Sequence, residues 1–191
     1  MESRRIAQQL HLQAVLLLLL LLIMAFIKLG ASARLLGEAN GTDLITSTCR
    51  HTEHLDVCIS TLQSHRDSRS ADVKGLALVS VEACIAHAEG TLSYVKQLRG
   101  NGGEGYAAEC LDDCLTEYSD ALEDLRGSVG ELQRGAYDSV NAMVSGAMTD
   151  SDTCEGGFGE TPGYSSPLTE RNDYFSMLCS NSLAIAALLS F

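Results

Sequence analysis

The sequence predicts an all-α protein built as a four-helix, up-down-up-down bundle. Long stretches carry apolar residues at steps of three and four, and no segment reads convincingly as a strand. The only two prolines, Pro162 and Pro167, lie in one predicted loop, which leaves the helical stretches uninterrupted. Short connections between long helices make sequence neighbours antiparallel, so four main helices can surround one core.

The N-terminus predicts a secretory signal peptide. Arg4 and Arg5 precede an apolar run over residues 14–27, and the small residues 31–33 form an A-x-A site. The alternative is a membrane anchor, but 14 residues of helix span about 21 Å, less than the roughly 30 Å of a hydrocarbon core. We expect cleavage after Ala33 and no stable membrane anchor afterwards. The predicted organisation is a signal peptide, a flexible N-terminal segment and a helical domain: 1–33, 34–42 and 43–190.

The mature chain is strongly acidic. Removal of residues 1–33 leaves 10 basic and 24 acidic residues, a net charge of −14. Nucleic acid, anionic lipid and polyanionic polysaccharide repel such a chain, so its long-range field favours a basic protein partner. An alternative is that the charge serves solubility alone.

Cysteines and one sequon support an extracellular location. Seven cysteines behind a secretory signal indicate disulfide bonds, with at least one thiol left over. Asn40 begins the sequence Asn-Gly-Thr, an acceptor for N-glycosylation, in a polar segment before the first predicted helix. We therefore expect a secreted glycoprotein.

Hydrophobic spacing locates the N-terminal helices. Residues 42–50 and 52–64 are predicted as two short helices that form a helical hairpin or an N-terminal extension. A long amphipathic helix follows over residues 71–99, and the glycine-rich run 100–105 ends it.

The second half of the chain continues this pattern. The helix over residues 106–133 has the most regular apolar spacing, and a fourth amphipathic stretch starts at Tyr137. That stretch is predicted to end before a loop over residues 149–167. Apolar residues between 175 and 189 supply the last helix.

The predicted helix over residues 106–133 is strongly acidic. Like charges at i,i+4 spacing, such as Asp120 with Asp124, cost a few tenths of a kcal/mol each. This excess indicates a face kept for a basic partner, although a plain solvated face is the alternative. Against the single cation Arg126 stand eight acids: Glu109, Asp112, Asp113, Glu117, Asp120, Glu123, Asp124 and Glu131.

No pattern in the sequence indicates catalysis. The run 100–105 resembles a phosphate loop only in glycine content, because no strand precedes it and no lysine follows it. There is no nucleophile elbow, and five scattered histidines offer no evident base for a serine or cysteine. We expect a non-enzyme that needs no cofactor.

One cluster has the composition of a zinc site. Cys49, His51, His54 and Cys58 place four potential ligands within ten residues. In a secreted chain the two cysteines more often pair with each other, and we therefore expect no metal here.

Five short motifs follow one another in an order typical of a known family. They are Cys49 with Cys58, Gly75-Leu76-Ala77, the run from Asp113 to Ala121, the run from Ser145 to Thr149 with Thr153-Cys154, and the run from Ser180 to Ala184. Each motif is short, but the ordered cysteine framework is specific. Over about residues 43–190, the chain resembles the plant invertase and pectin methylesterase inhibitors.

The resemblance implies a four-helix bundle with an N-terminal helical hairpin. It also implies two disulfides, Cys49–Cys58 and Cys114–Cys154. Chain entropy would make the longer loop the stronger staple, at roughly 4 kcal/mol against about 2.5 to 3 kcal/mol.

Three cysteines fall outside those bridges. Cys179 matches a position where relatives often keep a free thiol, whereas Cys84 and Cys110 depart from the family pattern. Across an antiparallel pair that turns near Gly102, Cys84 would face a residue near 120, so a bond to Cys110 is unfavourable. We expect three buried free thiols that act as small apolar residues.

The family contains two activities on one scaffold, and local sequence must separate them. Invertase inhibitors carry Pro-Lys-Phe after the acidic helix, where this chain has Gly135-Ala136-Tyr137. This difference favours inhibition of pectin methylesterase, with invertase (β-fructofuranosidase) as the alternative target. A non-inhibitory secreted helical module, active as an interaction partner only, is a further alternative.

The resemblance also implies a mode of action. Relatives cover the substrate cleft of the target enzyme in a reversible one-to-one complex, in the apoplast or cell wall. The candidate contact residues carried over by position are Asp120, Glu123 and Thr153. Thr116 stands where relatives often carry an acid, so we do not assign it a contact.

Overall fold

The computed structural model describes residues 17–24, 42–101 and 104–190, and the chain divides into two units after Asn40. In the first unit, residues 17–24 are helical and their apolar side chains are exposed. The predicted cleavage point after Ala33 and the predicted glycosylation site at Asn40 lie outside the described residues. No described helix is both long and apolar enough to span a membrane.

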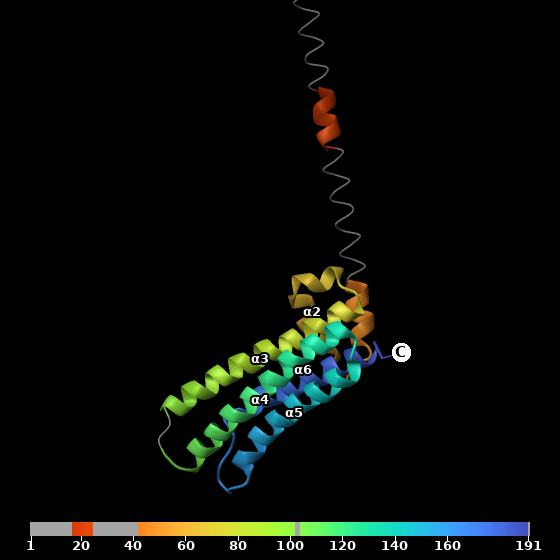
Figure 1. Ribbon diagram of the computed structural model, residues 1–191. Coiled ribbons are helices and arrows are strands. Elements are labelled where there is room, and N and C mark those ends of the chain that lie inside the picture. Colours follow the sequence, from red (N-terminus) through yellow and green to blue (C-terminus); the bar gives the residue numbers. More distant parts are fainter. Residues whose placement is uncertain (1–16, 25–41, 102–103, 191) are drawn as a thin grey trace, which may run out of the picture. The chain divides into compact units, whose positions relative to one another are not determined.

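Four long helices form the second unit and confirm the predicted all-α bundle. Figure 1 shows them lying side by side, with successive helices running in opposite directions. Helix α4 packs between α3 and α5, and α6 closes the bundle against α3 and α5. The described residues contain no strand. The helices are α3 (Val73–Asn101), α4 (Tyr106–Arg134), α5 (Tyr137–Gly159) and α6 (Thr169–Ala187).

A tight turn makes α4 and α5 antiparallel neighbours. Gly135 has φ of +76°, a left-handed conformation that glycine adopts without steric cost. Its N–H donates to the carbonyl of Leu132, and the N–H of Ala136 donates to that of Glu131. This C-cap satisfies the last carbonyls of α4, so the chain can reverse direction within two residues.

The N-terminal helical hairpin is confirmed, and it is anchored to the bundle. A helix over residues 42–49 and α2 (Leu55–Ser64) are joined by the Cys49–Cys58 disulfide. Buried Asn181 of α6 accepts from the N–H of His54 at 3.2 Å and donates to its carbonyl at 3.1 Å. A 3₁₀ turn, η1 (Arg66–Ser70), which the sequence analysis does not anticipate, leads from α2 into α3.

The predicted loop over residues 149–167 is wrong in its first part. Helix α5 continues to Gly159, and the connection to α6 is the shorter stretch over residues 160–168. Buried Ser151, Cys154 and Phe158 extend the apolar face of α5 beyond Ala147 at steps of three and four. Packing of this face overrides the low helix propensity of the nearby glycines.

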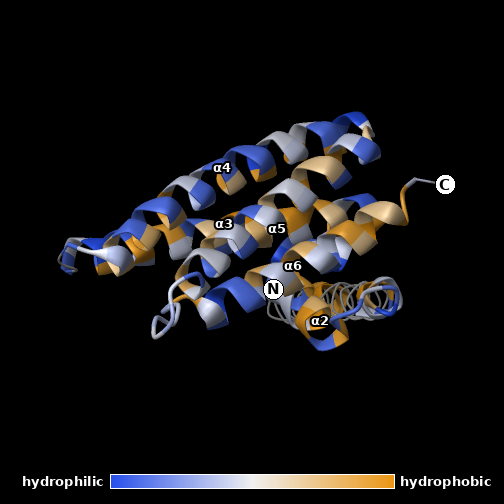
Figure 2. Cartoon of the chain, turned by 90° about the horizontal axis from the view of Figure 1, so that it is seen from below, coloured by the Kyte–Doolittle hydropathy of each residue, from blue (hydrophilic) through white to orange (hydrophobic). Residues whose placement is uncertain are grey.

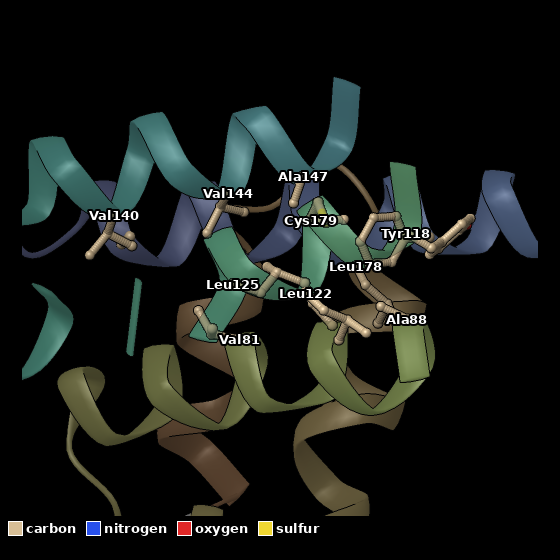
Figure 3. Close-up of a cluster of buried hydrophobic side chains, with 14 of the residues drawn as sticks. Val81, Ala88, Tyr118, Leu122, Leu125, Val140, Val144, Ala147, Leu178 and Cys179 are labelled. Atoms are coloured by element: carbon tan, nitrogen blue, oxygen red, sulfur yellow. The ribbon is translucent and has the colours of Figure 1, made fainter. Parts of the chain in front are cut away.

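The core contains two fully buried aromatic rings. Tyr118 of α4 and Phe175 of α6 lie 5.6 Å apart between ring centroids. The Tyr118 hydroxyl donates to Oδ1 of Asn172 at 2.6 Å, which satisfies its polar end inside the bundle. Figure 3 shows labelled side chains from all four helices converging here, and Figure 2 shows apolar residues gathered along the inner sides of the helices.

The cysteines divide as the family resemblance implies. The structure contains the disulfides Cys49–Cys58 and Cys114–Cys154 and leaves three buried free thiols. With Cys49 and Cys58 bonded to each other, the zinc cluster considered above loses its two thiolate ligands. Within the described part of the chain, no group of acidic, histidine or cysteine side chains is arranged to hold a metal ion.

Candidate partner-binding surface

A row of carboxylates follows α4 on the side that meets α5. Steps of three and four residues keep the row on one side of α4, and Asp150 of α5 lies near its middle, where three α4 carboxylates act on it. We call this surface the α4–α5 acidic face. It consists of Glu109, Asp113, Glu117, Asp120, Asp124 and Asp150.

Crowding of negative charge alters two of these carboxyl groups. Burial, and then the charges of Glu117, Asp124 and Asp120, raise the pKa of Asp150 to about 6. Burial and the nearby charges of Asp120 and Asp113 also raise the pKa of Glu117. At mildly acidic pH the face therefore holds a proton that isolated carboxylates would release.

The two helices that carry the face are held close together. A Cβ built on Gly146 of α5 would lie 2.6 Å from Oδ2 of Asp124, so a larger residue there would force this half-buried carboxylate to shift. Further along, the Cys114–Cys154 disulfide brings the two Cα atoms to 4.7 Å. The carboxylates of α4 and α5 are thus presented on a covalently joined helix pair.

A partly open groove of about 400 Å³ lies at the end of the face nearest the start of α4. The Tyr106 hydroxyl donates to the carbonyl of Gly157 across this end, and its ring packs against Tyr164 at 4.8 Å between centroids. Two adjacent glycines, Gly156 and Gly157, leave backbone accessible in the wall. The other lining residues are Glu109, Cys110, Asp113, Glu117, Thr153, Cys154 and Glu160.

Three arginines of the described bundle form ion pairs away from this face. Within residues 42–101 and 104–190, no carboxylate of the α4–α5 acidic face takes part in a salt bridge. The negative charge of the face is therefore not neutralised internally, so a partner that covers the face either pairs with these carboxylates or desolvates them. The pairs are Arg99–Asp112, Arg126–Glu89 and Arg134–Glu131.

The structure brings two of the three predicted contact residues to this surface. Asp120 is exposed within the acidic face, and exposed Thr153 lines the groove, with its hydroxyl donating to the carbonyl of Thr149 at 3.0 Å. Glu123 is also exposed on α4. At 100° per residue, however, Glu123 lies on the far side of Asp120 from Glu117. It stands at the outer edge of the face.

Sequence reasoning missed Asp150 and the groove because it placed residues 149–167 in a loop. The repeated steps from Ala147 to Ser151, Cys154 and Phe158 were a signal for continued helix, which the nearby glycines obscured. No sequence signal reveals that Asp124 would rest against Gly146, because that approach depends on the register of two helices.

A carboxylate-rich face on two covalently joined helices is suited to contact with another protein. The model of the family described as "Plant invertase/pectin methylesterase inhibitor" matches residues 43–185, and the chain belongs to this family. Members of this family are inhibitors, so the chain is not an enzyme. The partner of the chain is a protein, from the invertases or the pectin methylesterases that the family description names.

Relatives carry both names that the family description joins. A "Putative invertase inhibitor" from Platanus acerifolia is 29% identical over 161 residues, which cover 81% of this chain and 90% of the relative. "Pectinesterase inhibitor 28" from Oryza sativa subsp. japonica is 31% identical over 157 residues, covering 77% and 69%. The fold matches a mutant pectin methylesterase inhibitor from Arabidopsis with a TM-score of 0.65 at 22% identity, covering 75% of this chain and 95% of that one.

Proposed function

We propose that this chain inhibits pectin methylesterase by binding it reversibly, one to one, over its substrate cleft. The α4–α5 acidic face, free of internal salt bridges in the described bundle, is the observation that carries the proposal. A second support is the turn at Gly135-Ala136-Tyr137, which lacks the Pro-Lys-Phe sequence of invertase inhibitors. Invertase is the alternative target, favoured by the name of the Platanus relative.

The proposed contacts come from α4 and α5. Asp120 and Thr153 lie on the acidic face and in its groove, whereas Glu123 contributes from the outer edge of α4. A partner that covers the face removes water from carboxylates that already repel one another. This desolvation raises their pKa values further, so the complex takes up protons on binding.

The sign of the pH dependence follows from this proton uptake. A carboxyl group whose pKa is higher in the complex than in the free protein favours the complex at low pH. Affinity then falls as pH rises through the raised pKa values, by up to about tenfold per pH unit for each proton taken up. Asp150 begins with a pKa of about 6, so the change is expected between about pH 5 and pH 8.

A titration of inhibition across that range tests the proposal. We expect the dissociation constant for a plant pectin methylesterase to rise from pH 5 to pH 8, and Asp150→Asn to flatten this dependence. Asp173→Asn, which removes an exposed acid from α6, serves as the charge-matched control and should leave the slope unchanged. Inhibition that strengthens with pH would instead indicate salt bridges to a basic enzyme and would reject the desolvation mechanism.

The proposed site of action is the cell wall. It is supported by the predicted signal peptide over residues 1–33 and by pectin, the substrate of the pectin methylesterases that the family description names. Glycosylation at Asn40 would accompany passage through the secretory pathway. Expression of the full chain in plant cells checks the predicted cleavage and the predicted glycosylation. N-terminal sequencing of the secreted form should give a start at Arg34, and enzymatic deglycosylation should lower its mass.

A further inference from the structure

Two buried thiols meet where α3 packs against α6. Cys84 of α3 and Cys179 of α6 are both fully buried, and neither belongs to the two disulfides of the structure. The Sγ atom of Cys84 lies 3.4 Å from Oγ of Ser182, which is itself buried on α6. Ser182 follows Cys179 by three residues, so both side chains lie on the same side of α6.

The register of the two antiparallel helices places Cys179 beside Cys84. Nε2 of His87, one turn after Cys84, hydrogen-bonds the carbonyl of Arg171 at 2.9 Å, and its ring lies 5.2 Å from that of Tyr174. Because the two helices are antiparallel, residues nearer the start of α3 contact residues nearer the end of α6. A position opposite Cys84 falls between Tyr174 and Ser182, which is where Cys179 lies. Figure 3 shows Cys179 inside the bundle core.

The chemistry of the two thiols agrees with this placement. A hydrogen bond with Cys84, and then burial, raise the pKa of Cys179 well above its ordinary value. The two thiols therefore interact with each other inside the core. The two disulfides already present are a feature of proteins that fold in an oxidising compartment.

We infer that Cys84 and Cys179 form a third disulfide, which joins α3 to α6 in the oxidised protein. With it, three antiparallel pairs of helices would each carry one covalent link: the hairpin through Cys49–Cys58, α4 to α5 through Cys114–Cys154, and α3 to α6. This bond closes the side of the bundle opposite the α4–α5 pair. It is absent from the family pattern, because Cys84 departs from that pattern.

The oxidant is a small-molecule or protein disulfide. One thiolate attacks a sulfur of that disulfide and expels a thiolate, which leaves a mixed disulfide on the chain. The second thiolate then attacks the chain's sulfur, forms the Cys84–Cys179 bond and expels the other thiolate of the oxidant. Two thiols of the chain are oxidised, two electrons pass to the oxidant, and its two leaving thiolates take up the two released protons.

Burial determines when this exchange can occur. The thiolate is the attacking species, and a buried thiol with a raised pKa is poorly ionised and inaccessible to an oxidant. The bond therefore forms during folding, before α3 and α6 have fully packed against each other. Once the bundle has closed in the reduced form, the pair stays protected.

Cys110 is the internal control. It is buried on α4 and lines the groove near Tyr106, on the α4–α5 side of the bundle. This position separates it from the α3–α6 contact, so Cys110 should keep its thiol. The inference thus predicts one free thiol in the oxidised chain. Three free thiols remain when Cys84 and Cys179 are reduced.

Thiol counting tests the inference. The mature chain is unfolded, reduced and refolded in a mixture of reduced and oxidised glutathione, then denatured, alkylated without reduction and weighed by mass spectrometry. We expect one alkylated cysteine and a linked peptide that joins Cys84 to Cys179. Cys110→Ser should leave no alkylated cysteine, and Cys84→Ser should leave two.

Any other pattern overturns the inference. Three alkylated cysteines in a chain that has formed Cys49–Cys58 and Cys114–Cys154 would show that the pair stays reduced under oxidising conditions. A link from Cys84 to Cys110, or a link between two chains, would place the third bond elsewhere. These counts come from the wild-type chain, so they stand even where a variant folds poorly.

Discussion

Substitution of Asp150 by asparagine should stabilise the bundle at neutral pH and have little effect near pH 4. Burial and the charges of Glu117, Asp124 and Asp120 raise the pKa of Asp150 to about 6, against an ordinary value of 3.8. Between these two values the folded chain binds more protons than the unfolded chain. The stability contributed by this group therefore falls as pH rises from 3.8 to 6 and stays low above 6.

The size of the effect follows from the same difference. At face value it corresponds to ~3 kcal/mol, since each pKa unit is worth ~1.4 kcal/mol. Asp150 is only partly buried, and solvent screening reduces this to about 1 kcal/mol. Asp150→Asn removes the charge, so we expect its free energy of unfolding to exceed that of the wild type by about 1 kcal/mol at pH 7.5.

Urea unfolding at several pH values measures this directly. The midpoint of Asp150→Asn should exceed that of the wild type at pH 7.5, and the two curves should converge toward pH 4. Asp173→Asn, at an exposed position on α6, removes the same charge without the crowding and should change stability little at either pH. An equal gain at both pH values, or a loss at pH 7.5, would refute the account of crowded carboxylates.

Two further predictions concern the staples of the fold. Cys114→Ser should lower the free energy of unfolding by roughly 4 kcal/mol, because it removes the disulfide that closes a loop of 40 residues. Cys110→Ser removes only a free thiol and should cost much less. Equal losses in thermal unfolding would reject this ranking. Asn181→Ala should release the hairpin, because it removes both hydrogen bonds to His54 at a cost of about 1 to 3 kcal/mol. Hydrogen exchange should then quicken in α2 more than in α4, and uniform acceleration would argue against a local anchor.

Much of the fold was predictable because it depends on local patterns. The apolar steps in the helix ending near residue 133 locate α4 within one residue of its observed end, and Gly135 marks the turn. The end of α5 was not predicted, since Gly156, Gly157 and Gly159 outweighed the buried steps to Phe158. Tertiary packing decided that boundary, and a single sequence carries little record of such packing.

The candidate site was predictable only in its charge. The excess of acids on one helix is visible in the sequence, and the structure places Asp120 within the α4–α5 acidic face. The contribution of Asp150 comes from the opposite helix, so it depends on register rather than on local spacing. The same holds for Asp124 against Gly146 and for Cys84 against Ser182.

The central claim is that the acidic bundle inhibits pectin methylesterase, and inhibition by the mature chain tests it most directly. Protein beginning at Arg34 is titrated into a purified plant pectin methylesterase and, in parallel, into an acid invertase, each near pH 5 and with a chelator present. The account predicts stoichiometric loss of methylesterase activity while invertase stays active. Inhibition of invertase with methylesterase unaffected, or of neither enzyme, would contradict it.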